Sequence, residues 1–211
     1  MVKQIGPYFY VRIILYVIIL ALSITSLASN KWGEISAVIG SSSVGKNSDM
    51  IPLNLNGSGY VNMKGNKTSP PSWINTVFYL MIVGTALQGV GFILNMADLS
   101  QKNDNFVLSG YALTFVGSVL VISAASEWMD QMKGFDKDYV DMVSAAVKAF
   151  DSKVDAKLIV KSTWAPPLAL ASGILGAASA IVGMVLEMHK RQMGKNSELS
   201  RSPYNDAMYD N

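Results

Sequence analysis

The sequence predicts an all-α membrane protein: a bundle of four transmembrane helices with a small extracellular β-sheet and an amphipathic helix on its outer face. Four stretches of the 211-residue chain lack Asp, Glu, Lys and Arg, at residues 13–30, 72–97, 105–126 and 162–186. Each can cross the roughly 30 Å hydrocarbon core of a bilayer as a helix that rises about 1.5 Å per residue. The composition agrees, because 50% of the chain is hydrophobic and only 15% is charged.

The four spans are expected at about 9–30, 73–97, 105–127 and 165–188, within one tetraspan domain that covers residues 1–211. They leave outer loops at residues 31–72 and 128–164, a short inner connection, and a cytoplasmic tail at residues 189–211. An alternative for the first stretch is a cleaved signal peptide. Lys3 and Arg12 precede that stretch, and Ser26-Leu27-Ala28 resembles a small-residue cleavage site.

The first outer loop has the pattern of a small β-sheet. Residues 51–55 and 60–63 alternate between apolar and polar side chains and flank a turn-forming tetrapeptide at residues 56–59. Residues 35–39 can supply a further strand. Because Pro52 cannot donate a hydrogen bond to a ladder, its strand should lie at an edge or begin there.

The second outer loop should contain an amphipathic helix at residues 139–154. Its apolar side chains recur at helical spacing: Val140, Val143, Val147, Phe150 and Val154. This helix can cap the bundle, lie on the outer leaflet or dock on the sheet, and the pattern does not choose among these. The last span then opens with Pro166 and Pro167, which suit a first helical turn because their missing N–H groups would be unpaired there anyway.

Two N-glycosylation sequons favour a plasma-membrane topology with both termini in the cytoplasm. The sequons begin at Asn56 and Asn66, and both lie in the first outer loop. The distribution of Lys and Arg does not decide the orientation, since seven of the 17 would lie inside and ten outside. The net charge of +2 gives no reason to expect a nucleic-acid partner.

The sequence predicts no enzyme activity, cofactor or metal site. Ionisable residues at mid-depth usually mark transport or catalysis inside a membrane, and the four stretches contain none. The chain has no cysteine, and His189 directly follows the last span, where an interfacial residue is the ordinary interpretation. Polar residues near mid-depth are expected to hydrogen-bond between helices: Ser23, Thr25, Ser26, Thr85, Gln88, Ser118, Ser172 and Ser179.

Small residues at four-residue spacing mark the last span as a helix-packing face. They form two adjacent strips: Ala169, Gly173 and Ala177, and Ser172, Gly176 and Ala180. Such strips let two backbones approach closely, either within the bundle of one chain or against another subunit.

Three further sets of site residues follow from the loops and the tail. Candidate extracellular contact residues are Trp32, Leu53, Leu55, Tyr60 and Phe150. Ser202, which precedes Pro203, is a candidate phosphorylation site, although a bare solvated tail is the simpler interpretation. Lys190, Arg191 and Lys195 form a juxtamembrane basic cluster after the last span.

The order of these elements resembles the claudin-like tetraspans, a group that includes claudins, peripheral myelin proteins and channel-regulating relatives. Trp32 stands just past the first span, where that group places its first-loop tryptophan, and residues 117–123 followed by Trp128 are similar too. The paired first-loop cysteines and their Gly-Leu-Trp neighbour are missing, and the chain does not end in a hydrophobic residue that a PDZ domain would capture. The MARVEL tetraspans and the fungal plasma-membrane-compartment proteins share the layout with weaker cysteine demands.

The resemblance and the residues imply a non-enzymatic tetraspan that organises membrane or cell–cell contacts through lateral association and through its outer loops. Its partners would be further copies of itself, or a larger integral membrane protein, and lipids. The alternative is an accessory subunit of a channel, transporter or membrane-bound synthase, which would dock through Ser172, Gly176 and Ala180. A third hypothesis is a pore or carrier.

Overall fold

A computed structural model describes residues 7–29, 31–39, 46–47, 51–53, 72–97, 104–150 and 156–200. It contains four long helices: α1 (Pro7–Ala28), α2 (Ser72–Ala97), α3 (Asp104–Phe150) and α4 (Ala165–Ser200). Each includes a segment that is long and apolar enough to cross a membrane, at Tyr10–Ala28, Ser72–Ala97, Phe106–Gly134 and Ala165–Met193. The chain is therefore a multi-pass membrane protein with four spans.

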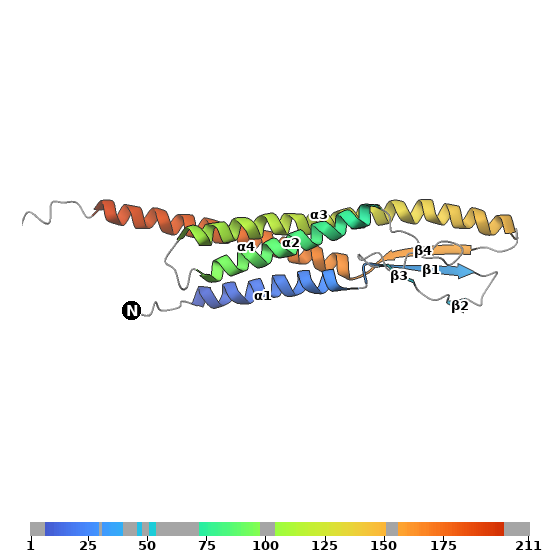
Figure 1. The fold of residues 1–211 in the computed structure, drawn as a ribbon, viewed down its shortest axis with the longest axis horizontal. Helices are drawn as coiled ribbons and strands as arrows, with labels where there is room; N and C mark the ends of the chain where they lie inside the picture. The colour runs from blue at the N-terminus through green and yellow to red at the C-terminus, as the bar shows by residue number, and fades with distance from the viewer. Residues whose placement is uncertain are drawn as a thin grey trace, which may run out of the picture.

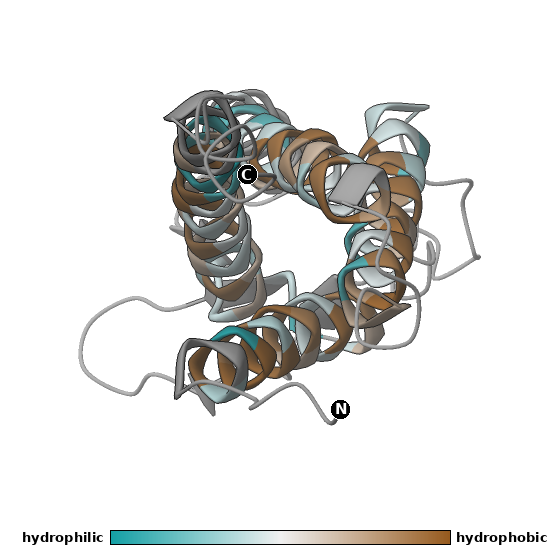
Figure 2. Ribbon diagram, turned by 90° about the vertical axis from the view of Figure 1, so that its left-hand side faces the viewer, coloured by the Kyte–Doolittle hydropathy of each residue, from teal (hydrophilic) through white to brown (hydrophobic). Residues whose placement is uncertain are grey.

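The four helices form a closed ring in which each contacts two neighbours. The contacts join α1 to α2, α2 to α3, α3 to α4, and α4 back to α1, and the pair α2–α3 is the most extensive. Figure 1 shows the start of α1 and the end of α4 at one end of the bundle, which we call the terminal end. The opposite end carries the strands, and we call it the sheet end. Figure 2, seen along the bundle, shows apolar residues on all four helices.

The buried faces of α2 and α3 repeat every seven residues. The buried residues of α2 are Ile74, Val77, Met81, Gly84, Gln88, Gly91 and Asn95, at alternating intervals of three and four. On α3, Val107, Thr114, Val121 and Trp128 are buried at intervals of seven. A mean interval of 3.5 residues keeps one seam facing a partner only if the two helices coil gently around each other in the left-handed sense. The pair α2–α3 thus has the packing pattern of an antiparallel coiled coil.

A small antiparallel sheet is organised around β1 (Gly33–Ile39). β4 (Ala156–Ser162) pairs with the whole of β1, from Gly33 opposite Ser162 to Ile39 opposite Ala156. β3 (Ile51–Leu53) and β2 (Lys46–Asn47) pair with the two halves of β1. Because a strand has two edges and β4 fills one of them, β2 and β3 share the other.

Short connections join this sheet to the bundle. β1 begins at Gly33 soon after α1 ends at Ala28, and β4 ends at Ser162 just before α4 begins at Ala165. Backbone bonds tie the two connections together: Thr163 N–H donates to the Trp32 carbonyl over 3.4 Å, and Ala165 N–H donates to the Lys31 carbonyl over 3.2 Å. The hydroxyl of Thr163 also donates to the Lys31 carbonyl.

The second outer loop differs from the expectation. α3 continues without a break to Phe150, so the helix expected at residues 139–154 is the distal part of the third span helix rather than a separate element. No proline stands between residues 72 and 165 to stop a helix. β4, which the sequence analysis did not predict, follows and contacts α3. Figure 1 shows the distal part of α3 running alongside the strands.

The tail and the first loop also differ in part. α4 continues to Ser200, so residues 189–200 are helical and not an irregular tail; the next proline is Pro203. The strands expected at residues 35–39 and 51–55 correspond to β1 and β3 (Ile51–Leu53), and residues 54 and 55 lie outside the described residues. The strand expected at residues 60–63 and the turn at residues 56–59 lie outside the described residues. That the sheet lies outside the cell stays a prediction.

Candidate functional site: the bundle interior and the sheet junction

One side chain from each helix meets in a buried polar hub, which we define as Ser23, Gln88, Ser118 and Ser172. The hydroxyl of Ser23 donates to Gln88 Oε1 over 2.8 Å, and Gln88 Nε2 donates to Ser118 Oγ over 3.0 Å. The hydroxyls of Ser23 and Ser172 lie 2.8 Å apart. All four residues are fully buried. The hub joins α1, α2, α3 and α4 at one level of the bundle.

Three hydrogen bonds join the members of the hub to one another. A hydroxyl has one proton to donate. Ser23 donates its proton to Gln88, so Ser172 must be the donor in the bond between Ser23 and Ser172. The Ser172 hydroxyl can instead donate to the Ala169 carbonyl, which lies 2.9 Å away. In a bilayer core, where water does not supply alternative partners, each of these bonds stabilises the assembled bundle by about 0.6 kcal/mol on average.

Other polar residues near mid-depth follow the expectation only in part. Ser26 Oγ donates to the Ala165 carbonyl of α4 over 2.7 Å, which is a further bond between helices. Ser179 bonds its own helix at Gly176, and Thr25 is exposed on the outer face of α1. The buried hydroxyl of Thr85 has no hydrogen-bond partner within the described part of the chain.

Glycines close the contact between α2 and α3. A Cβ atom at Gly117 would lie 2.6 Å from the carbonyl oxygen of Gly84, and one at Gly84 would lie 2.8 Å from the carbonyl oxygen of Gly117. Gly91 and Gly110 oppose each other in the same way, with corresponding separations of 2.6 and 2.8 Å. Real Cβ atoms essentially never come so close to another atom. These two pairs therefore require glycine for the observed helix separation.

The small-residue strips of α4 face into the bundle of the same chain. The six residues are buried or half-buried: Ala169, Ser172, Gly173, Gly176, Ala177 and Ala180. Gly173 packs against Ile122 and the Ser118 carbonyl, and Gly176 packs against Ser118 and Gln88 of the hub. The interpretation of Ser172, Gly176 and Ala180 as a docking face for a partner is therefore wrong, because helices of the same chain already cover them.

A second polar group lies toward the terminal end. Asn95 Nδ2 donates to the Tyr16 hydroxyl over 2.9 Å and to the Gly91 carbonyl over 3.0 Å. Arg12 donates to the Tyr111 hydroxyl and to the Asn95 carbonyl, each over 3.2 Å. These contacts join α1, α2 and α3 at the edge of the membrane. They also attach α1 to α2 and α3 within the bundle.

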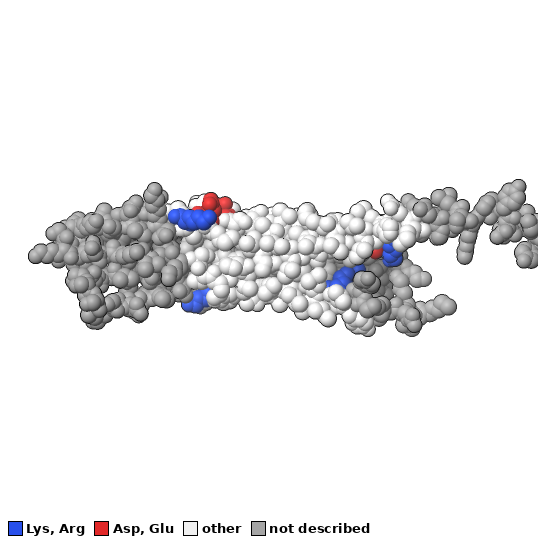
Figure 3. Space-filling model, turned by 180° about the vertical axis from the view of Figure 1, so that it is seen from behind, with Lys and Arg blue, Asp and Glu red and all other residues white. Residues whose placement is uncertain are grey.

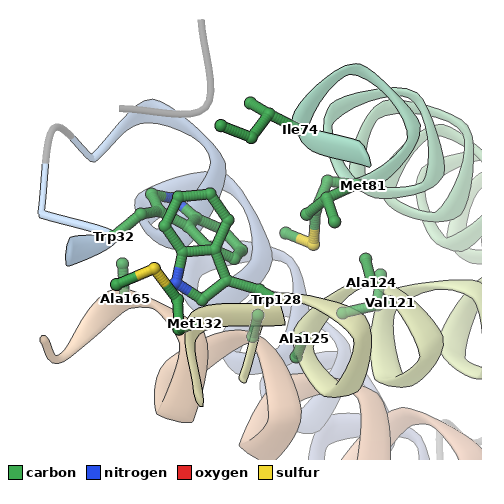
Figure 4. Packing of buried hydrophobic residues seen from close by; sticks show 11 residues of the cluster. Trp32, Ile74, Met81, Val121, Ala124, Ala125, Trp128, Met132 and Ala165 are labelled. Carbon is green, nitrogen blue, oxygen red and sulfur yellow. The ribbon is translucent and has the colours of Figure 1, made fainter. Parts of the chain in front are cut away.

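A tryptophan cluster, defined as Trp32, Trp73 and Trp128, fills the sheet end of the bundle. The ring of Trp128 meets the rings of Trp32 and Trp73 edge-on, with both centroid distances at 5.2 Å. Figure 4 shows Trp32 and Trp128 in contact, with Met132 and Ala165 beside them. Trp32 Nε1 donates to the Ser26 carbonyl over 2.8 Å, whereas Trp128 Nε1 is buried without a hydrogen-bond partner among the described residues.

The cluster corrects one expected contact residue. Trp32 is fully buried, so it supports the junction between α1 and the sheet and cannot serve as an extracellular contact. Leu53 is the last residue of β3, and Phe150 is the last residue of α3. Leu55, Tyr60, the sequon residues Asn56 and Asn66, and Ser202 lie outside the described residues.

Charged side chains gather at the two ends of the described bundle. Figure 3 shows an uncharged belt between them. Arg12, Glu187, Lys190 and Arg191 lie at the terminal end, and Lys31, Glu127, Asp130 and Lys133 lie at the sheet end. Among the described residues, no group of three or more His, Cys, Asp or Glu could hold a metal ion. The described interior thus offers hydrogen-bonding groups that are engaged mainly with one another.

Two features of this site escaped the sequence analysis although signals were present. The seven-residue spacing of Gly84 to Gly91 and of Gly110 to Gly117 is visible in the sequence and predicts facing glycines on an antiparallel pair. The apolar run Leu158-Ile159-Val160 in β4 has strand composition, but so short a run does not identify its partner.

No protein-family model matches the sequence, and no curated protein matches it either.

Proposed function

We propose that this protein is a non-enzymatic plasma-membrane tetraspan that organises membrane or cell–cell contacts. Its helix surfaces associate laterally with further copies of the chain or with a larger integral membrane protein. Its sheet end also associates with such partners. The resemblance to claudin-like and MARVEL-type tetraspans is part of this proposal and rests on the layout and on Trp32 and Trp128.

The observation that carries the proposal is the polar hub. Three hydrogen bonds join its four residues to one another, and the facing glycines bring the helices α2 and α3 into backbone contact. A bundle closed in this way offers its outer surfaces for interaction. This supports an associative role over a pore or carrier, which would need polar groups lining an open path.

The sheet end supports the second half of the proposal. β1 and β4 are paired along seven residues each, and both are joined to span helices by connections that are themselves hydrogen-bonded. The tryptophan cluster packs beneath that junction. A surface held this firmly keeps its shape when it meets a partner, which lowers the ordering cost of association.

The proposed orientation has the termini in the cytoplasm and the sheet outside the cell. It is supported by the two N-glycosylation sequons, which begin at Asn56 and Asn66 in the first outer loop.

Cysteine crosslinking in the native membrane tests the proposal. The natural chain has no cysteine, so each introduced thiol is the only one. Val17, Tyr79, Val116 and Val182 lie on the outer faces of α1, α2, α3 and α4, respectively. A single cysteine at one or more of these positions should give a covalent dimer after mild oxidation. The matched control is Val121→Cys, whose side chain is fully buried and should give none.

Purification in mild detergent completes the test, with identification of whatever co-migrates. Self-crosslinks at an outer face together with co-migrating copies of the chain support the proposal. A strictly monomeric protein in lipid with no crosslinked neighbour would overturn it. A stoichiometric large polytopic partner would replace it with the accessory-subunit alternative, docked on an outer face rather than on the buried strips of α4.

A further inference from the structure

The sheet joins the bundle at one junction, which we define as Ser26, Lys31, Trp32, Thr163 and Ala165. The two strands that pair along their whole length connect to span helices here, since β1 follows α1 and β4 precedes α4. We propose that this junction couples the sheet to the pairing of α1 with α4. A partner that binds and steadies the sheet end would thereby also hold these two spans together more firmly. This consequence rests on the proposed function, whereas the coupling itself does not.

Ala165, the first residue of α4, is bonded both to α1 and to the chain that enters β1. Its N–H donates to the Lys31 carbonyl over 3.2 Å, and its carbonyl accepts from Ser26 Oγ over 2.7 Å. Ser26 and Ala165 are fully buried. Because water does not replace a buried hydrogen bond, α1 and α4 cannot slide past each other here without a loss of stability.

Trp32 attaches the start of the sheet to the same residue of α1. Its Nε1 donates to the Ser26 carbonyl over 2.8 Å, and its own carbonyl accepts from Thr163 N–H over 3.4 Å. The ring is fully buried and meets Trp128 edge-on (Figure 4). A movement of the residue that precedes β1 would therefore uncover a large apolar ring and disturb Ser26 at the same time.

The pairing of α1 with α4 continues from the junction into the polar hub. Ser23 lies three residues before Ser26, about 4.5 Å along the axis of the helix. Its hydroxyl lies 2.8 Å from that of Ser172 on α4. Both serines belong to the unbroken helix α1. Because a continuous helix moves as a stiff unit, a displacement of the end of α1 by the sheet reaches the hub.

A second route from the sheet to the bundle exists, because β4 also contacts α3. The two routes enter different sides of the hub. Ser172 of α4 bonds Ser23 of α1, whereas Ser118 of α3 accepts from Gln88 of α2. All four side chains are fully buried. Alanine at position 172 or 118 thus removes one buried hydroxyl of the hub in either case, but only Ser172 belongs to the pair α1–α4.

Hydrogen exchange of the full-length protein in lipid nanodiscs measures the coupling. The readout is the exchange rate of the backbone amides of β1 and β4, followed by mass spectrometry of their peptides. Ser26→Ala removes the bond from α1 to Ala165, and we expect it to accelerate exchange in both strands by roughly threefold. Ser172→Ala lies deeper in the bundle and should accelerate exchange by a smaller factor.

Two matched controls lose a hydroxyl of the same size outside the pair α1–α4. Ser179→Ala removes a hydroxyl of α4 that bonds its own helix at Gly176. Ser118→Ala removes the hub bond between α2 and α3. Neither control should change the exchange of β1 or β4. If Ser26→Ala does not fold, the comparison of Ser172→Ala with Ser118→Ala decides the question alone.

Two outcomes would overturn the coupling. In the first, Ser26→Ala and Ser172→Ala leave the strands at the wild-type exchange rate. In the second, Ser118→Ala accelerates the strands as much as Ser172→Ala does, so that the effect is a general loss of bundle stability or passes through α3. The measurement needs neither a second copy nor an outside partner. Its failure therefore leaves the proposed function standing, and a strictly monomeric protein leaves the coupling standing.

Discussion

At the scale of the residue, Trp32 and Trp128 form a matched pair. Both side chains are fully buried and their rings touch, but Trp32 Nε1 donates to the Ser26 carbonyl whereas Trp128 Nε1 has no partner among the described residues. Replacing either with Phe removes similar ring area. Only Trp32→Phe also removes a hydrogen bond, the one that the Ser26 carbonyl accepts from Trp32 Nε1. We expect Trp32→Phe to cost about 1 kcal/mol more in unfolding free energy than Trp128→Phe.

The measurement is reversible unfolding in mixed micelles, followed by circular dichroism so that the loss of a fluorophore does not matter. The wild-type chain and both variants are compared under one condition. Equal costs, or a larger cost for Trp128→Phe, would show that the bond from Trp32 to Ser26 contributes nothing measurable.

At the scale of the element, the helix pair α2–α3 depends on its facing glycines. Gly117→Ala places a methyl group 2.6 Å from the Gly84 carbonyl, so the helices must separate or shift. Overpacking of this kind destabilises by about 1–3 kcal/mol. Gly89 lies on α2 with nothing within 4 Å of its Cβ position. Gly89→Ala should therefore be neutral or stabilise the helix by up to about 1 kcal/mol.

Thermal unfolding in detergent distinguishes the two glycine variants. A lowered midpoint for Gly117→Ala beside an unchanged or raised midpoint for Gly89→Ala is the expected pattern. If both substitutions lower the midpoint equally, the separation of the two helices is not set by Gly84 and Gly117.

The register of β1 and β4 is a second prediction at this scale. Ala37 stands opposite Leu158, so Ala37→Cys with Leu158→Cys should form a disulfide under mild oxidation. Ala37→Cys with Ile159→Cys is the control, because neighbouring residues of a strand point to opposite faces. Mass spectrometry of the digested protein identifies the linked peptides. Preferential linkage of the control pair would mean that the strands are shifted by one residue.

The elements show which parts of this fold a sequence can predict. Uncharged stretches located all four spans, because crossing a membrane imposes a length and a composition that are local properties. β4 was missed because its partner β1 lies more than a hundred residues earlier in the chain, and strand pairing over that distance leaves no local mark. The distal part of α3 was assigned to a separate helix because Glu127 and Asp130 marked the end of the apolar stretch, although nothing there stops a helix.

The candidate site was predictable to a similar degree. Ser23, Gln88, Ser118 and Ser172 were expected to bond between helices because a polar side chain in a lipid environment needs a partner. Which hydroxyl meets which amide depends on the rotation of each helix, and that is fixed by contacts such as Gly84 with Gly117. The burial of Trp32 could not be predicted from the sequence, because it depends on where Trp128 lies in the fold.

At the scale of the whole molecule, the orientation in the membrane can be tested directly. Because the natural chain has no cysteine, single variants Lys190→Cys and Lys133→Cys place one thiol at each end of the bundle. Both positions are exposed. A membrane-impermeant maleimide applied to intact cells should label Lys133→Cys, and should label Lys190→Cys only after the membrane is opened. The reverse pattern would place the termini outside.

The continuity of α3 sets a minimum clearance above the membrane. From Gly134, where its membrane-capable segment ends, to its last residue Phe150, the helix rises about 24 Å at 1.5 Å per residue. β4 runs back beside this part of α3 and contacts it, so the distal part of the helix is supported by the sheet. Any opposing bilayer or tall neighbouring ectodomain on that side is kept away by roughly this distance, and two molecules that met tip to tip would hold two membranes about twice as far apart.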